Sequence, residues 1–227
     1  MPGDMTSTSA IVNRSLRARV CPILRAGGFE RVDARSGWRW IDEVVWVVKI
    51  RAVGHYFSEV TGWPPGSIGV SLGVMYSFMP HGETKVDQEG RMLPEEHACN
   101  LRSSLVCELD QKDLLRRLQN PAERKRRDLW WVDPDGRNAD EVAGDIGRAL
   151  AETGLPWFGQ RTSLAGALAL VEAQDDCFAK YAKASFLAHE IGDQVLWRRY
   201  DLLAEAEARR IGHSVDRNTW TCHGLPI

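Results

Sequence analysis

The 227-residue sequence has no long hydrophobic run and no marked excess of charge of either sign. No segment approaches the roughly 20 apolar residues that a membrane-spanning helix needs. The first ten residues, MPGDMTSTSA, lack the basic start and apolar core of a secretory signal. With 29 Lys and Arg against 31 Asp and Glu, the net charge is −2, so the chain has no overall attraction to nucleic acid or an anionic membrane. We therefore predict a cytoplasmic protein without a membrane partner.

The cysteines are too few and too irregularly spaced for a disulfide framework. Their odd number, five, predicts reduced thiols in a cytoplasm. His97 and Cys99 form an H-x-C pair, Cys107 follows at a distance, and Cys222 and His223 stand near the C-terminus. Because structural zinc sites use four ligands at tight spacing, we predict neither a metal nor a cofactor.

Signatures of nucleophilic and phosphate chemistry are also missing. No G-x-S-x-G pattern occurs, and the glycines of GWPPGSIG and AGGFE do not lie between a strand and a helix, as in phosphate-binding loops. The polar groups left for an enzyme are Asp42, Glu43, His55 and His81, near predicted strand ends. His189 lies on an apolar helical stripe and is expected in the core. The sequence therefore favours a protein that is not an enzyme.

What the sequence does contain is a set of clear strand patterns. FERVDARSGWRWI (29–41) predicts two strands around a Ser-Gly turn, and VVWVVKIRAV (44–53) predicts a central strand. In SIGVSLGVMYSF (67–78), large apolar residues alternate strictly with a face of small residues that includes Gly69, Ser71 and Gly73. SSLVCEL and DLWWVD predict two further strands. Together these segments predict an antiparallel sheet of about five strands.

Helical patterns lie before and after these strands. A first helix is predicted from 10 to 27 and another from Asn138 to Gly154, both packed mainly on the Gly/Ser face of the sheet. Three amphipathic helices follow as a C-terminal bundle. The fold class is therefore α+β. The expected divisions are a disordered lead (1–9), an α+β domain (10–160) with a long loop at 79–102, a helical bundle (161–214) and a tail (215–227).

The order of these motifs resembles a known family. A leading helix ending in LRAGGF is followed by a hairpin, a long strand, GVSLGV, LWW, an acidic helix and GLPWF. In this combination the chain resembles the bacterial domain of unknown function family 4304, over roughly residues 10 to 158. The resemblance implies no activity, substrate or catalytic residue.

Nine tryptophans are many for a chain of this length, and they gather on neighbouring predicted strands. Most belong in a core, since each removes roughly 150 to 250 Å² from water, whereas a surplus in loops is typical of partner-binding surfaces. In RDLWWVDPDG, Trp130 and Trp131 point to opposite faces, so we expect one under a helix and the other toward the C-terminal bundle or a partner. The predicted partner or ligand surface consists of Trp38, Trp40, His55, Trp63, His81, Arg126, Arg127, Trp130 and Trp131.

A basic run, RRLQNPAERKRRD, extends from Arg116 to Asp128. Its arginines could neutralise phosphates beside a stacking tryptophan, but Glu123 and Asp128 interrupt it, so a solvated face is favoured.

Three hypotheses for function follow. The leading one is a bacterial cytoplasmic protein that is not an enzyme and binds another protein, such as an immunity or accessory factor. It rests on the missing motifs, the surplus tryptophans and the loop at 79–102, expected to be an insertion rather than a lid. The alternative is a small-molecule-binding or hydrolytic enzyme with its site on the Gly/Ser face, near His55 and His81. The third is nucleic-acid binding through the segment from Arg116 to Arg127.

Overall fold

The structure is a computed structural model that describes residues 8–81, 84–212, 215–216 and 221–222. Its centre is an antiparallel sheet ordered β1-β2-β3-β4-β7, with β8 pairing to the first two residues of β4. The predicted α+β class with an antiparallel sheet is confirmed. The strands of this sheet are β1 (Arg31–Val32), β2 (Ser36–Ile41), β3 (Val44–Ala52), β4 (Ile68–Tyr76), β7 (Leu101–Ser104) and β8 (Leu129–Trp130).

The turn between β1 and β2 lies before the Ser-Gly pair, not at it. Asp33 Oδ1 accepts hydrogen bonds from the backbone N–H groups of Arg35 and Ser36, each at 2.7 Å. A side chain that binds the backbone two and three residues ahead makes a tight turn by itself. Ser36 and Gly37 therefore belong to β2, opposite Lys49 and Val48.

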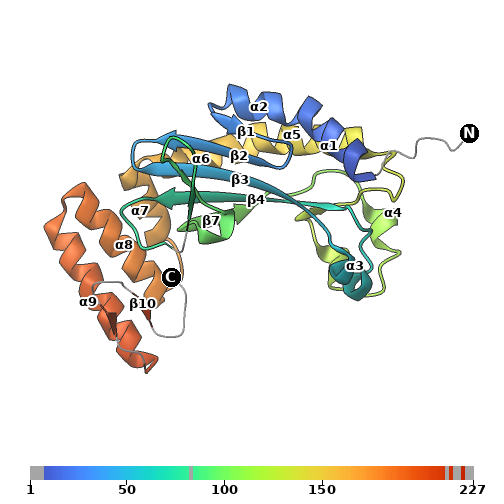
Figure 1. Ribbon diagram of the computed structural model, residues 1–227. Helices are drawn as coiled ribbons and strands as arrows, with labels where there is room; N and C mark the ends of the chain where they lie inside the picture. Colours follow the sequence, from blue (N-terminus) through green and yellow to red (C-terminus); the bar gives the residue numbers. More distant parts are fainter. Residues whose placement is uncertain (1–7, 82–83, 213–214, 217–220, 223–227) are drawn as a thin grey trace, which may run out of the picture.

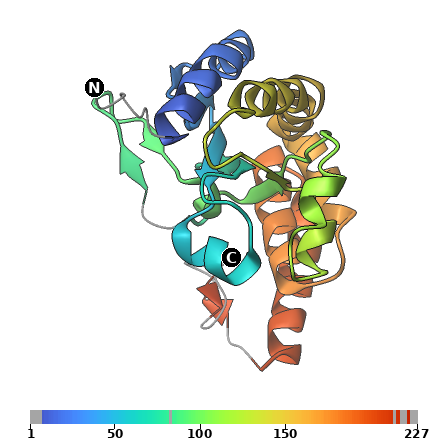
Figure 2. The same ribbon diagram turned by 90° about the vertical axis from the view of Figure 1, so that its right-hand side faces the viewer.

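Helices α1 (Thr8–Arg19), α2 (Cys21–Ala26) and α5 (Ala139–Ala149) cover one face of the sheet; Figure 2 shows α1 and α5 side by side above it. The face they cover is the large apolar one, so the prediction that they pack on the Gly/Ser face is wrong. Burying a large aliphatic side chain contributes about 1.5 to 3 kcal/mol, which glycine and serine cannot match. The core beneath these helices includes Val12, Leu16, Ile68, Val70, Leu72, Val74, Tyr76, Val142 and Ile146.

The predicted helix from Asn138 does not end at Gly154. Gly154 has helical dihedral angles (φ −66°, ψ −51°), and a π-helical segment, η3 (Leu150–Gly154), joins α5 to α6 (Leu155–Thr162). Pro156 falls in the first turn of α6, where a missing N–H costs little. Gly154 is therefore not the end of the helix, because the residues on both sides of it are also helical.

Three C-terminal helices, α7 (Leu164–Glu172), α8 (Phe178–Ile191) and α9 (Gln194–Arg210), confirm the predicted helical bundle. Ser163 caps α7, Asp193 caps α9, and Gly192 ends α8 with a φ of 84°. The inner sides of α7 and α8 belong to the same core as the sheet. His189 is exposed on α8, with its ring against Trp197, and is not the core histidine expected.

The remaining elements are short. Helix α3 (His55–Thr61), which the sequence did not predict, follows β3 and lies at the opposite end of the molecule from α9 (Figure 1). Thr8 and Ser9, expected in a disordered lead, begin α1, and the rest of that lead lies outside the described residues. None of the described helices is both long and apolar enough to cross a bilayer. The other short elements are β5 (Lys85–Val86), β6 (Met92–Leu93), η1 (Glu96–Ala98), α4 (Lys112–Leu115), η2 (Glu123–Lys125), β9 (Val215–Asp216) and β10 (Thr221–Cys222).

Candidate functional site

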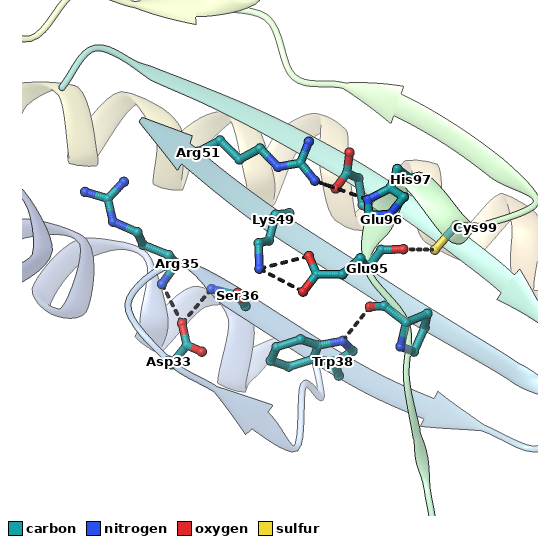
Figure 3. Close-up of polar contacts among 11 residues, drawn as sticks. Asp33, Arg35, Ser36, Trp38, Lys49, Arg51, Glu95, Glu96, His97 and Cys99 are labelled. Carbon is teal, nitrogen blue, oxygen red and sulfur yellow. Dashed lines mark hydrogen bonds and ion pairs between the residues drawn. The ribbon is translucent and has the colours of Figure 1, made fainter. Parts of the chain in front are cut away.

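The second face of the sheet carries Gly69, Ser71 and Gly73, and half of it is covered by the chain itself. Residues 92–99, here called the strap, cross β2, β3 and β4 on this face (Figure 3). Trp38 Nε1 donates to the carbonyl of Pro94 at 3.0 Å, and Trp40 Nε1 donates to that of Met92 at 2.9 Å. The strap therefore lies on two tryptophans of β2.

Charged pairs hold the strap to β3. Lys49 Nζ lies 3.0 Å from Glu95 Oε2, and the Arg51 guanidinium pairs with Glu96 (Figure 3). The Lys49 ammonium lowers the pKa of the Glu95 carboxyl, chiefly through their hydrogen bond. Gly73 allows close approach, since a Cβ there would lie 2.5 Å from Cys99 Sγ. The strap is thus a packed part of the loop predicted at 79–102.

The tryptophans do not form the predicted surface. Trp63 and Trp130 have no exposed area, and Trp38 and Trp131 are also buried. Trp40 is half-buried, with the Arg91 guanidinium 4.0 Å from its ring centre. Their large apolar area explains the outcome: these rings supply the core on both faces of the sheet.

The adjacent pair Trp130 and Trp131 does divide between two faces. Trp130 lies in the main core beneath α5, the position under a helix that was expected for one of the pair. Trp131 does not face the C-terminal bundle; its ring centre lies 5.8 Å from that of Trp63, in a small second core with Leu118 and Leu129. The segment between β7 and β8 folds back to build this core, a contact distant in sequence.

His55 and His81 are not parts of one site. His55 follows β3, beside the first residue of β4, whereas His81 follows the far end of β4. At about 3.3 Å per residue, the ends of this nine-residue strand are roughly 26 Å apart. His55 is exposed and pairs with Glu59, 3.2 Å away on α3. The hydrolytic site predicted around both histidines is therefore not assembled.

The basic segment is broken up by local pairing. Arg126 forms a two-point contact with Asp128 (2.9 and 2.5 Å), and Arg127 pairs with Glu108 at 3.0 Å. This pairing raises the pKa of Arg126 and lowers that of Asp128. Since Trp130 and Trp131 are buried, no base can stack on them, and the predicted nucleic-acid surface loses its aromatic part.

The described cysteines are not grouped with other metal-binding side chains. Among the described residues, no group of three or more His, Cys, Asp or Glu side chains is placed to hold a metal ion. Cys99 and Cys107 are buried in separate cores, and burial raises the pKa of both thiols. The side chain of Cys222 and all of His223 lie outside the described residues.

A groove of about 400 Å³ lies on the part of the Gly/Ser face that the strap does not cover. Strand β4 pairs with β8 at Ile68 and Gly69 but with β7 from Ser71 to Val74, and the groove opens where one partner gives way to the other. The sequence did suggest this face, through its alternating small residues. It gave no sign of the other walls, which come from α3 and the segment before β8. The lining includes Arg51, Val53, Phe57, Gly69, Ser71, Ser104, Arg126, Asp128 and Leu129.

A second candidate is the outer surface of α9, at the edge of the molecule (Figure 1). Val195 is 79% exposed and Leu202 63% exposed, and they stand two turns apart on one stripe. Ile191, at the end of α8, adds a further exposed aliphatic side chain, and Arg198 and Arg199 lie between the two stripe residues. The sequence predicts a core stripe on this helix that does not include Val195 or Leu202, and this omission was the available signal for an exposed apolar stripe.

No family model, no curated protein and no solved structure matches this chain. The resemblance to domain of unknown function family 4304 therefore stays a prediction.

Proposed function

We propose that the chain is a bacterial cytoplasmic protein that is not an enzyme and binds another protein, as an immunity or accessory factor does. The observation that carries the proposal is the exposed stripe of Val195 and Leu202 on α9. Single exposed aliphatic residues are ordinary, but two on one helical stripe with arginines between them form a mixed apolar and basic surface. Such mixed apolar and arginine surfaces are typical of interaction sites.

The charges around the stripe indicate the kind of partner. Among the described residues, Arg198 and Arg199 have no carboxylate within ion-pair distance, whereas Arg209 and Arg210 pair with Glu205 and Glu207. A surface on which two guanidinium groups pair with no described carboxylate and lie beside aliphatic side chains complements an acidic protein surface with an apolar centre. The tryptophan surface of the sequence-based hypothesis is replaced by this helix face.

The proposal is tested by recovering the partner from the native host with the wild-type chain and with Leu202→Asp as baits. A stoichiometric partner should copurify with the wild type alone. Measured with the purified partner, Leu202→Ala should weaken binding by about 2 kcal/mol or more, since truncation at an interaction hot spot has this effect. The matched control is Val86→Ala, which changes an exposed valine on a different element. Equal affinity of the Leu202 and Val86 variants would contradict the proposal.

A further inference from the structure

We propose that the groove on the Gly/Ser face binds a small molecule that carries one anionic group, a carboxylate or phosphate, on an apolar body. A volume of about 400 Å³ fits a small ligand. The groove lies at the break between β7 and β8, where β4 changes its partner strand. Because neither strand runs alongside β4 at this break, side chains form the walls of the groove there.

Arg51 supplies a guanidinium group with N–H donors that are still available. Its Nη2 pairs with Glu96, whose side chain is only 9% exposed, and lies 3.5 Å from His97 Nδ1 (Figure 3). A buried carboxylate fixes the plane of the guanidinium before any ligand arrives. Among the described residues, Nε and Nη1 of Arg51 have no hydrogen-bond partner. These two atoms lie on different edges of the guanidinium, so each can donate a single hydrogen bond to an anionic oxygen.

Two hydroxyl groups lie beside this charge. Ser71 of β4 and Ser104 of β7 are directly opposite each other in the sheet, so their side chains share the groove face. No hydrogen bond joins either hydroxyl to another group among the described residues. A serine hydroxyl donates one hydrogen bond, so Arg51 and the two serines offer donors from neighbouring strands to one anionic group.

The opposite wall selects the rest of the ligand. Phe57 and Leu129 are apolar, and Arg126 lies over the Phe57 ring at 5.4 Å while paired with Asp128. Nε and Nη2 of Arg126 bind Asp128 and its Nη1 lies 3.5 Å from Glu123, so all three nitrogens of Arg126 already face a carboxylate. A ligand with its anionic group at Arg51 would therefore place an apolar body, such as a ring, against Phe57 and Leu129.

Isothermal titration calorimetry on the full chain tests the proposal with benzoate and phenyl phosphate as probes and benzyl alcohol as the uncharged comparison. At least one anion should bind saturably at one site, at least tenfold more tightly than the alcohol. Preference for benzoate would assign the carboxylate class, and preference for phenyl phosphate the phosphate class. Absence of saturable binding by either anion would overturn the proposal.

Substitutions in the groove test whether the anionic probe binds there. Arg51→Gln should weaken binding of the preferred anion at least tenfold. Since that change leaves the buried Glu96 without its partner, Ser104→Met is a second variant, which narrows the groove at an exposed position and keeps the Arg51–Glu96 pair. Arg116→Gln is the control, because it removes an exposed arginine that pairs with Asp113 outside the groove. If Ser104→Met and Arg116→Gln bind the anion equally well, the groove is not the site.

Discussion

Trp130 Nε1 donates a 2.8 Å hydrogen bond to Asp145 Oδ2, and this contact joins strand β8 to helix α5 inside the core. The Asp145 carboxylate is buried and also accepts from the backbone N–H of Glu108 at 3.1 Å and from the Arg148 guanidinium. One acid thus satisfies donors from two segments distant in sequence and from an arginine of its own helix. The ring of Trp130 can be fully buried because its N–H has this partner.

Asp145→Ala should destabilise the fold by about 1 to 3 kcal/mol, because the buried N–H of Trp130 loses its acceptor. Urea denaturation followed by tryptophan fluorescence measures the change in unfolding free energy. Asp140→Ala, which removes an exposed acid paired with Arg19, is the control and should leave stability nearly unchanged. A loss at Asp145 no larger than at Asp140 would contradict the assigned role.

Gly73→Val should loosen the strap, because a side chain there overlaps Cys99 Sγ and approaches the Glu96 backbone at 3.3 Å. Overpacking of this kind costs about 1 to 3 kcal/mol. Gly144→Ala is the matched control: it lies on the exposed side of α5 with no atom within 4 Å of the added Cβ. That change should instead stabilise by about 0.5 to 1 kcal/mol, since alanine favours helix. Thermal denaturation of both variants should show shifts of opposite sign.

The thiols should differ sharply in reactivity. Cys177 is exposed, whereas Cys21, Cys99 and Cys107 are buried. Burial raises the pKa of all three, that of Cys107 to about 12, and the thiolate is the reactive form. In a Cys222→Ser variant, a disulfide reagent should modify one thiol rapidly, and adding Cys177→Ser should abolish that phase. A second rapidly reacting thiol would show that a buried site opens.

Acid should weaken the attachment of the strap. Lys49 lowers the pKa of Glu95 first through a hydrogen bond and then through charge, and Arg51 and His97 act in the same direction. A carboxyl whose pKa is lower in the folded state stabilises the fold above its unfolded value of about 4.3, and this contribution is lost as the pH falls through the folded-state value.

The corresponding experiment compares urea midpoints between pH 7 and pH 3 for the wild type and Glu95→Gln. The variant should be less stable at pH 7 and should lose less stability on acidification. Glu152→Gln, an exposed change on η3, should follow the wild-type profile. Parallel profiles for the wild type and Glu95→Gln would contradict the role of this pair.

Local patterns predicted most of the elements for identifiable reasons. Strict alternation from Ile68 to Tyr76 predicted β4, and three amphipathic stripes predicted α7 to α9. Each of these patterns depends only on residues that are near one another in the chain. The errors occurred where a local signal competed with tertiary contacts. Gly154 resembles a helix cap but stays helical, and Ser36-Gly37 resembles a turn but extends β2 because Asp33 makes the turn.

The candidate sites were predicted less well, because each combines segments that are far apart in the chain. The groove joins β3, β4, β7 and α3, and only its Gly/Ser floor was visible as a pattern. The nine candidate residues were chosen by chemical type, and the structure buries four of their five tryptophans. Composition shows that tryptophan is abundant but not whether it lies inside or outside.

The sequence by itself determined the α+β class, the strand with one small-residue face and the three C-terminal helices, since period and propensity act between near neighbours in the chain. Only the tertiary structure decided which sheet face the helices cover, that the strap covers half of the other face, and that Trp130 and Trp131 enter two different cores. Those outcomes depend on which apolar surfaces meet and which buried donors find acceptors. Contacts of that kind join residues with no fixed spacing in sequence.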